Sequence, residues 1–118
     1  MGISLSIDGS DYNIWNVYGP CQSTERIAVF DRLCKVMLDR NYPGYTIAGG
    51  DFNVTLEPKI DKFGGNHKQC PSAKVLSEIM ESLDTSDVWR TKNHNKRQYT
   101  WRQKTPLIMC RLDLLVHR

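Results

Sequence analysis

The 118-residue sequence lacks a strong excess of charge of either sign. Its formal net charge is +3 and its isoelectric point is near 8.7. Such a balance permits contact with a phosphate backbone, but it falls short of the strongly basic composition of a dedicated nucleic-acid-binding protein. With 40% hydrophobic and 25% charged residues, the chain has the composition of one small globular domain with a single core.

Paired cysteines are also lacking. The spacing of the four cysteines predicts reduced thiols and no disulfide framework. His67 and Cys70 have side chains that bind zinc, but no second pair follows at finger-like spacing, so we interpret them as loop residues. The four cysteines are Cys21, Cys34, Cys70 and Cys110.

The sequence has no long hydrophobic run, no internal repeat and no low-complexity tract. No apolar run is long enough for a signal peptide or a membrane span. We therefore expect an intracellular protein without a membrane partner.

Sequence patterns predict alternating strands and helices. β-rich stretches bounded by turn residues predict strands, and apolar residues spaced by three and four predict helices. The alternation favours an α/β sandwich in which helices cover the outer faces of sheets. In chain order the expected elements are a hairpin of strands 4–7 and 12–18 around Asp8-Gly9, a helix over 23–38 that is broken at 41–44, a strand over 45–48, a loop over 57–70, a helix over 71–83, and strands over 99–101 and 111–116 that lie about a hairpin apart.

Asp51 and Asn53 are the first candidates for chemistry. Residues two apart in an extended segment share a face, so both can point into one cleft while Phe52 anchors the backbone in the core. A carboxylate can orient or deprotonate a water, and an amide can donate a hydrogen bond to the charge that develops on a phosphate oxygen. Gly49 and Gly50 leave room for substrate or for a neighbouring strand. An ordinary Asp/Asn turn after a strand fits these residues equally well.

The order of five short motifs extends this interpretation. It resembles the order seen in the endonuclease/exonuclease/phosphatase (DNase I-like) superfamily, and the similarity covers nearly the whole chain. The Asp-x-Trp-Arg and Tyr-Thr-Trp elements resemble the endonuclease domains of LINE-type non-LTR retrotransposons in particular. The resemblance implies a partial four-layer α/β sandwich, in which two packed, mainly antiparallel sheets are flanked by helices. The motifs are Asn16-Val17-Tyr18-Gly19-Pro20, Gly50-Asp51-Phe52-Asn53, Asp87-Val88-Trp89-Arg90, Tyr99-Thr100-Trp101 and Arg111-Leu112-Asp113.

The resemblance also implies roles for four catalytic residues. Tyr18 matches the tyrosine that contacts the scissile phosphate, although a tyrosine packed beside Trp15 is the simpler alternative. Asp51 matches the aspartate that activates the attacking water, and Asn53 matches the asparagine that stabilises the transition state. Asp113 matches the aspartate that orients a catalytic histidine, while an exposed position on an edge strand is its alternative.

Weaker assignments concern substrate and metal binding. Thr100 and Arg111 match the substrate-binding rim, although a threonine in a strand needs no function. The implied cofactor is Mg²⁺, with Mn²⁺ as a substitute, and Asp51 is a weak ligand for it. The family's asparagine after the Tyr-Gly-Pro turn is replaced by Cys21, a poor hydrogen-bond donor.

Two family motifs have no match in residues 1–118. The chain is therefore expected to be a partial domain that lacks the N-terminal segment with the metal-binding glutamate and the C-terminal Ser-Asp-His segment. Glu57 and His117 do not match these motifs and are not expected to replace them. We also expect the sheet face that the missing strands would cover to be apolar and exposed, which makes the chain prone to associate.

The implied function is magnesium-dependent hydrolysis of phosphodiesters. It is that of a retrotransposon-type endonuclease that nicks DNA and leaves a 3′ hydroxyl for target-primed reverse transcription. DNA is then the substrate, and the reverse transcriptase of a longer polyprotein is the expected partner. The expected location is nuclear for an active element, and the oligomeric state is left open. One alternative is a catalytically inactive truncated remnant with weak nucleic-acid binding. Another, an inositol or lipid phosphatase, is disfavoured by the Tyr-Thr-Trp motif.

Overall fold

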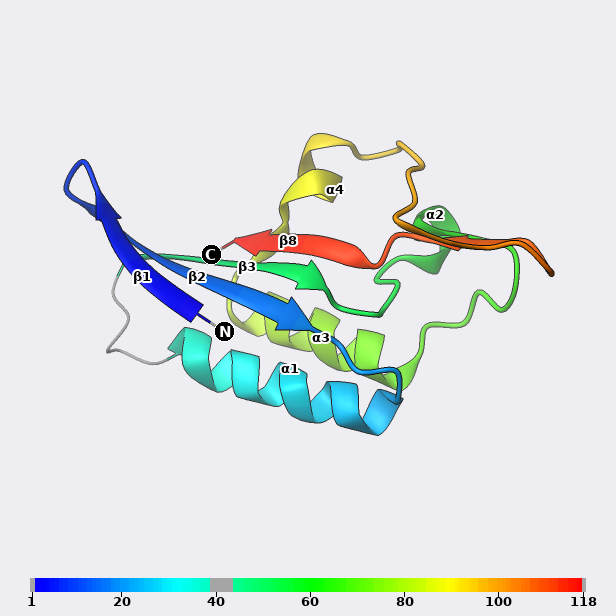
Figure 1. Cartoon of the computed structure of the whole chain (residues 1–118), viewed down its shortest axis with the longest axis horizontal. Helices are drawn as coiled ribbons and strands as arrows, with labels where there is room; N and C mark the ends of the chain where they lie inside the picture. Colours follow the sequence, from blue (N-terminus) through cyan, green and yellow to red (C-terminus); the bar gives the residue numbers. More distant parts are fainter. Residues whose placement is uncertain (1, 39–43, 118) are drawn as a thin grey trace.

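The computed structural model describes residues 2–38 and 44–117, in which two sheets and four helices are formed (Figure 1). The expected helix break at 41–44 falls mostly on residues 41–43, which lie outside the described residues. The elements in chain order are β1 (Gly2–Ile7), β2 (Ser10–Tyr18), α1 (Ser23–Leu38), β3 (Tyr45–Asp51), α2 (Pro58–Asp61), β4 (Lys62–Phe63), α3 (Pro71–Ser82), β5 (Ser86–Asp87), α4 (Val88–Lys92), β6 (Trp101–Gln103), β7 (Ile108–Cys110) and β8 (Asp113–His117).

The expected hairpin is formed by β1 and β2. Its two loop residues, Asp8 and Gly9, both have positive φ angles, of 50° and 80°. Positive φ at both central positions is typical of the type I′ turn, whose twist matches that of the flanking strands. The Asp-Gly pair thus sets the register in which Ile7 pairs with Ser10.

The larger sheet has the strand order β1-β2-β3-β8-β5. β2 and β3 are parallel and are connected through α1, whereas the other neighbouring strands are antiparallel. α1 and α3 run side by side on one face of this sheet, and α4 lies beyond β8, away from them (Figure 1). The smaller sheet has the order β4-β7-β6. It includes the hairpin of β6 and β7, which extends to one end of the molecule (Figure 1).

The core lies between the larger sheet and its two helices. Alternation along the strands places one set of side chains in this core, as Val17, Ala48 and Leu114 illustrate with exposures of 7% or less. From the helices, Phe30 of α1 and Leu76 of α3 are buried to the same degree. The helical periodicity read from the sequence therefore identifies the buried faces correctly.

Three segments differ from the predictions, the first being the expected strand over 99–101, because β6 begins only at Trp101. The expected loop over 57–70 contains α2 and β4, because Pro58 occupies the first helical turn and Lys62–Phe63 pairs with β7. The expected strand over 111–116 begins only at Asp113, and the partner of β6 is β7. The chain passes from the small sheet to the large one at Arg111, a buried residue held by ion pairs.

The face of the large sheet opposite α1 and α3 carries large apolar side chains that are exposed in the described structure. Strand register places Ile3, Ile7, Tyr45 and Leu115 on this open face, with exposures of 57%, 55%, 49% and 45%. Tyr45 stacks against Tyr12, at a centroid distance of 5.5 Å. The expected exposed apolar face is therefore present.

Candidate active site

Tyr18, Asp51 and Asp113 form one row across three neighbouring strands. Tyr18 ends β2 and pairs with Asp51, the last residue of β3, and Asp51 pairs with Asp113, the first residue of β8. Residues in register on adjacent strands present their side chains on the same face of a sheet. This row lies on the open face, with Tyr18 64% exposed. Three residues from distant parts of the sequence are thus brought together.

The backbone beyond the row is held by hydrogen bonds to neighbouring segments. The Gly19 N–H donates to the Asp51 carbonyl at 2.6 Å, and the Phe52 N–H donates to the Leu112 carbonyl at 3.0 Å. A Cβ atom on Gly19 would lie 2.0 Å from the Phe52 carbonyl oxygen, so this approach requires glycine. Phe52 is fully buried, as expected, and anchors the segment in the core.

Asn53 lies directly beside the row, in the left-handed region with a φ of 55°. Its backbone N–H donates to Asp51 Oδ1 at 2.8 Å, and its side-chain amide donates to the Pro20 carbonyl at 3.4 Å. Asparagine adopts this conformation more readily than most residues. The turn fixes the Asp51 carboxylate and connects it to the Gly19-Pro20 turn after β2.

Arg26 holds that same turn from the other side. Its buried guanidinium donates to the carbonyl oxygens of Pro20 and Cys21 at 3.0 and 2.6 Å, and its Nε donates to Ser72 Oγ at 2.9 Å. Arg26 was not identified from the sequence, because an arginine on an amphipathic helix usually faces solvent. The Cys21 side chain is itself exposed.

Thr100 supports the row through its hydroxyl group. Thr100 Oγ1 accepts hydrogen bonds from the backbone N–H groups of Leu112 and Asp113 at 2.9 and 3.2 Å. It therefore fixes the start of β8, which carries Asp113. Thr100 is also exposed, so a place on the substrate rim remains a prediction.

Arg111, predicted to bind substrate, lies in the interior with 3% exposure. Its guanidinium donates to both carboxylate oxygens of Asp61, at 2.8 and 3.1 Å, and to both of Asp87, at 2.6 and 3.3 Å. Burial acts to lower the pKa of Arg111, but the hydrogen bonds to Asp61 and Asp87 outweigh it and raise the pKa above its ordinary value. A guanidinium engaged in this way is not available to a substrate, so the position of Arg111 corrects that expectation.

Asp61 is the centre of this buried ion-pair cluster. Its side chain is 1% exposed and accepts from both Arg111 and Arg90. The two guanidinium groups also lie 5.1 and 4.9 Å from the ring centroid of Trp89. The sequence offered no signal for Asp61, because its partners are 29 and 50 residues away.

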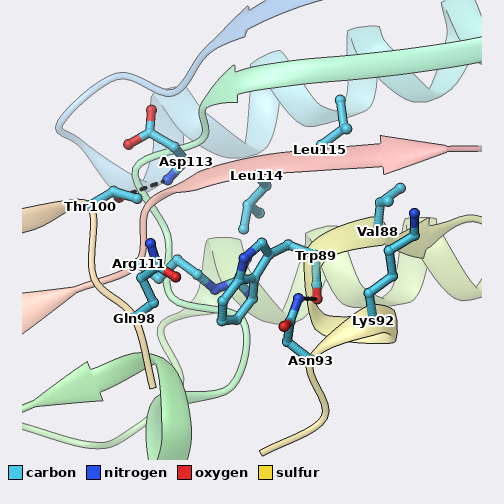
Figure 2. Close-up of a pocket in the computed structure, with 10 residues that line it drawn as sticks. All are labelled: Val88, Trp89, Lys92, Asn93, Gln98, Thr100, Arg111, Asp113, Leu114 and Leu115. Atoms are coloured by element: carbon cyan, nitrogen blue, oxygen red, sulfur yellow. Dashed lines mark hydrogen bonds between the residues drawn. The ribbon is translucent and has the colours of Figure 1, made fainter. Parts of the chain in front are cut away.

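A cavity of about 430 Å³ adjoins the row beside Asp113 (Figure 2). Thr100 and Asp113 lie at one end, Val88 and Lys92 at the other, and the Trp89 ring lies between them. A second cavity of about 330 Å³ shares Val88 and Lys92 and extends along β8. Leu115, which lies on the open sheet face, also lines both cavities.

Cys70 is a partly buried thiol at the start of α3. Burial acts to raise its pKa, but hydrogen bonds with the Ser72 side chain and the Ala73 backbone, together with the nearby Arg26 charge, lower the pKa below its ordinary value. The thiol and hydroxyl are 3.3 Å apart.

The row offers the type of oxygen ligand that magnesium prefers, but too few such ligands for a complete site. Asp51 and Asp113 provide carboxylates in neighbouring register, and magnesium prefers such oxygen ligands. Within residues 2–38 and 44–117, however, no group of three or more His, Cys, Asp or Glu side chains is placed to hold a metal ion. These residues do not form a complete magnesium site by themselves.

Glu57 and His117 do not supply the missing groups. Glu57 is exposed, and its carbonyl accepts from Ile60 and Asp61 at the start of α2. His117 stacks on Tyr45 at 6.1 Å and lies four residues along β8 from Asp113, roughly 13 Å at the rise of an extended strand. Asp113 therefore has no histidine partner on β8. Residues 2–38 and 44–117 contain no helix long and apolar enough to cross a membrane.

Comparison with known proteins identifies the fold. No family model matches the chain. The chain is similar to an AP endonuclease from Archaeoglobus fulgidus, with a TM-score of 0.72 and 23% identity, over 98% of this chain and 51% of that one. The chain therefore has a DNase I-like fold. The predicted α/β sandwich class is thereby confirmed.

Two further structures share the DNase I-like fold. AP endonuclease LMAP from Leishmania major has a TM-score of 0.65 and 19% identity, over 98% of this chain and 44% of that one. A humanized D. rerio TDP2 has a TM-score of 0.66 and 13% identity, over 99% of this chain and 43% of that one. The chain thus spans about half the length of these structures.

One curated relative is similar in sequence. It is the transposon TX1 uncharacterized 149 kDa protein of Xenopus laevis, which is 33% identical over 93 residues. The match covers 79% of this chain and 7% of that protein. A transposon protein agrees with the resemblance to the retrotransposon branch of the superfamily.

Proposed function

We propose that this chain is the part of a DNA endonuclease that carries the row Tyr18, Asp51 and Asp113 together with Asn53. The observation that carries the proposal is the row itself, in which strand register aligns a tyrosine and two aspartates at one end of a DNase I-like sheet. Three polar residues on the open face of three strands are not needed for the core. Their convergence supports a shared reaction site.

The proposed reaction is hydrolysis of a phosphodiester by water. Asp51 accepts a proton from the water, whose oxygen bonds to phosphorus while the bond between phosphorus and O3′ breaks, and the leaving oxygen takes up a proton to give a 3′ hydroxyl. The Asn53 amide donates a hydrogen bond to charge that develops on the phosphate, and the Tyr18 hydroxyl donates to a phosphate oxygen. Asp113 orients a histidine supplied by the flanking sequence of a longer chain. Magnesium dependence belongs to the proposal, with Asp51 as this chain's ligand, but no step is assigned to the metal.

DNA is the proposed substrate, because the segment that carries Thr100 and leads to Asp113 is rich in exposed basic residues. Residues 88–112 include seven lysines and arginines and no aspartate or glutamate. Arg90 and Arg111 belong to the buried cluster, whereas the other five basic residues are exposed, as is Trp101 at 43%. Exposed cations with an aromatic side chain among them suit contact with a phosphate backbone and bases. We place the activity in a longer transposon polypeptide that nicks nuclear DNA to prime reverse transcription.

A second candidate is a non-catalytic remnant that binds nucleic acid. The observation in its favour is the shortage of metal ligands among the described residues. The two candidates predict different behaviour when the chain is extended at both ends by its own flanking sequence.

A nicking assay on supercoiled plasmid separates these candidates. The 118-residue chain alone should show no magnesium-dependent nicking above background, because a missing catalytic group costs about a hundredfold to a thousandfold in rate. The extended chain should nick, and Asp51→Ala should reduce the rate by at least about a hundredfold. Asp31→Ala, which removes an exposed carboxylate from α1, is the matched control and should be unaffected. An inactive extended chain would favour the remnant, and nicking that survives Asp51→Ala would contradict the assigned row.

A further inference from the structure

A small cavity beside Asn53 is lined by two lysines and by other polar side chains. Its volume is about 130 Å³, roughly ten times the space that one water molecule requires, so a phosphate group fits. The lining includes no aspartate or glutamate. Its polar members are Asn53, Thr55, Lys62, Lys68 and Cys70.

The two lysines are the source of positive charge. No carboxylate among the described residues lies within ion-pair distance of Lys62 or Lys68, since the ion pairs found there involve only Arg90 and Arg111. Lys62 Nζ instead donates to the Asn66 carbonyl at 2.6 Å. Two cations beside one cavity without a counterion favour the binding of an anion.

The loop between the two lysines is shaped to bring them together. Gly64 and Gly65 both have positive φ angles, of 75° and 68°, which turn the chain back after β4. Asn66 then contacts both lysine residues, because its carbonyl accepts from Lys62 Nζ and its side chain accepts from the Lys68 backbone N–H at 2.9 Å. Local structure therefore holds the Lys62 side chain and the Lys68 backbone beside the cavity, whose lining includes both residues.

Asn53 joins this cavity to the row. It lines the cavity, and its backbone N–H is bound to the Asp51 carboxylate at 2.8 Å. A phosphate held by the lysines would lie next to a phosphate held at the row. The nucleic-acid backbone provides phosphates in such succession along one strand.

We propose that the cavity beside Asn53 is a phosphate-binding subsite in which Lys62 and Lys68 hold the phosphodiester adjacent to the scissile one. The inference rests on the proposed function for the source of that phosphate. The chemistry of the site itself, two lysines facing an oxyanion, applies equally to free phosphate.

The first experiment titrates the 118-residue chain with inorganic phosphate and follows backbone amide resonances by NMR. Saturable shifts are expected at Asn53, Lys62 and Lys68. They should disappear in the double variant Lys62→Gln/Lys68→Gln and persist in Arg32→Gln/Lys35→Gln, which removes two exposed charges from α1. No saturable shifts in the unmodified chain, or equal shifts in both double variants, would overturn the subsite.

The second experiment measures affinity for a short DNA duplex as a function of salt concentration. Loss of one phosphate contact should reduce the slope of log K against log salt by about 0.9 in Lys62→Gln/Lys68→Gln relative to the α1 control. An unchanged slope would refute a DNA phosphate as the occupant. Specific phosphate shifts without any DNA binding would support the anion site and count against the proposed function instead.

Discussion

Replacement of Asp61 by alanine should destabilise the protein more than any single change at the surface. The Asp61 side chain is 1% exposed and accepts from two arginines, so its removal leaves the buried Arg111 charge with Asp87 alone. Removing one partner of a buried ion pair costs about 3–5 kcal/mol. Domains of this size have total stabilities of about 5–15 kcal/mol, so the loss is a large fraction of the whole. At about 4 °C per kcal/mol, the melting temperature should fall by roughly 12–20 °C.

Urea unfolding followed by tryptophan fluorescence measures this effect. Asp31→Ala on α1 is the control and should stay within about 0.5 kcal/mol of the unmodified chain. Asp61→Asn, which keeps the shape and one acceptor oxygen, should lose less stability and provides a variant that folds if Asp61→Ala does not. In a double-mutant cycle with Arg111→Met, the two losses should fall short of additivity by about 1–3 kcal/mol. A loss below about 1 kcal/mol for Asp61→Ala, or strict additivity, would refute the central place of this ion pair.

Three further predictions follow from other contacts. Thr100→Val should cost about 0.5–1.5 kcal/mol and accelerate hydrogen exchange at the Leu112 and Asp113 amides, whereas Thr100→Ser should retain protection. Equal exchange in both variants would contradict the role of the hydroxyl. Cys70 should be alkylated by iodoacetamide with a midpoint below the ordinary thiol pKa of 9.0, and Ser72→Ala should move that midpoint up. Because the pKa of Cys70 is lowered in the folded state, the ionised thiol stabilises the fold above pH 9.0, and this contribution is lost as the pH falls through the folded pKa. The free energy of unfolding should therefore depend less on pH in Cys70→Ser than in the unmodified chain over this window. The same pH dependence in both proteins would argue against a lowered pKa. Finally, Leu115→Glu should reduce binding of a hydrophobic dye and self-association without loss of folding, and unchanged dye binding would show that the open face is not the exposed apolar surface.

The sequence was sufficient to predict the local elements and the members of the row. Period-two alternation placed Tyr18 and Val17 on opposite faces, and the Asp-Gly turn predicted the first hairpin, because both depend on neighbouring residues. The resemblance assigned Tyr18, Asp51 and Asp113 to one active site, but their strand register comes from the structure, since a single sequence does not reveal it. Their catalytic roles stay predictions.

The errors arose where long-range contacts decide the structure. The match to the Arg-Leu-Asp motif predicted Arg111 as a substrate-binding residue, but two carboxylates distant in the chain hold it in the interior. The strands β4 and β7 are two and three residues long, too short to show periodicity, so their pairing depends on the rest of the small sheet. Partners that are dozens of residues away leave no local pattern to read.

The open face of the large sheet changes from apolar to polar along its strands. Near the hairpin end it carries Ile3, Ile7 and Tyr45, and at the opposite end it carries the row. A second layer of protein packed on this face would gain free energy by burying the apolar end, but it would lose free energy by burying the unpaired carboxylates of the row. We therefore expect such a covering layer to end at the row. The edge of that cover would then form the second wall of the reaction site. If the row acts as proposed, burial of the sheet and completion of the site would be one and the same event, and an uncovered sheet would present the row without its second wall.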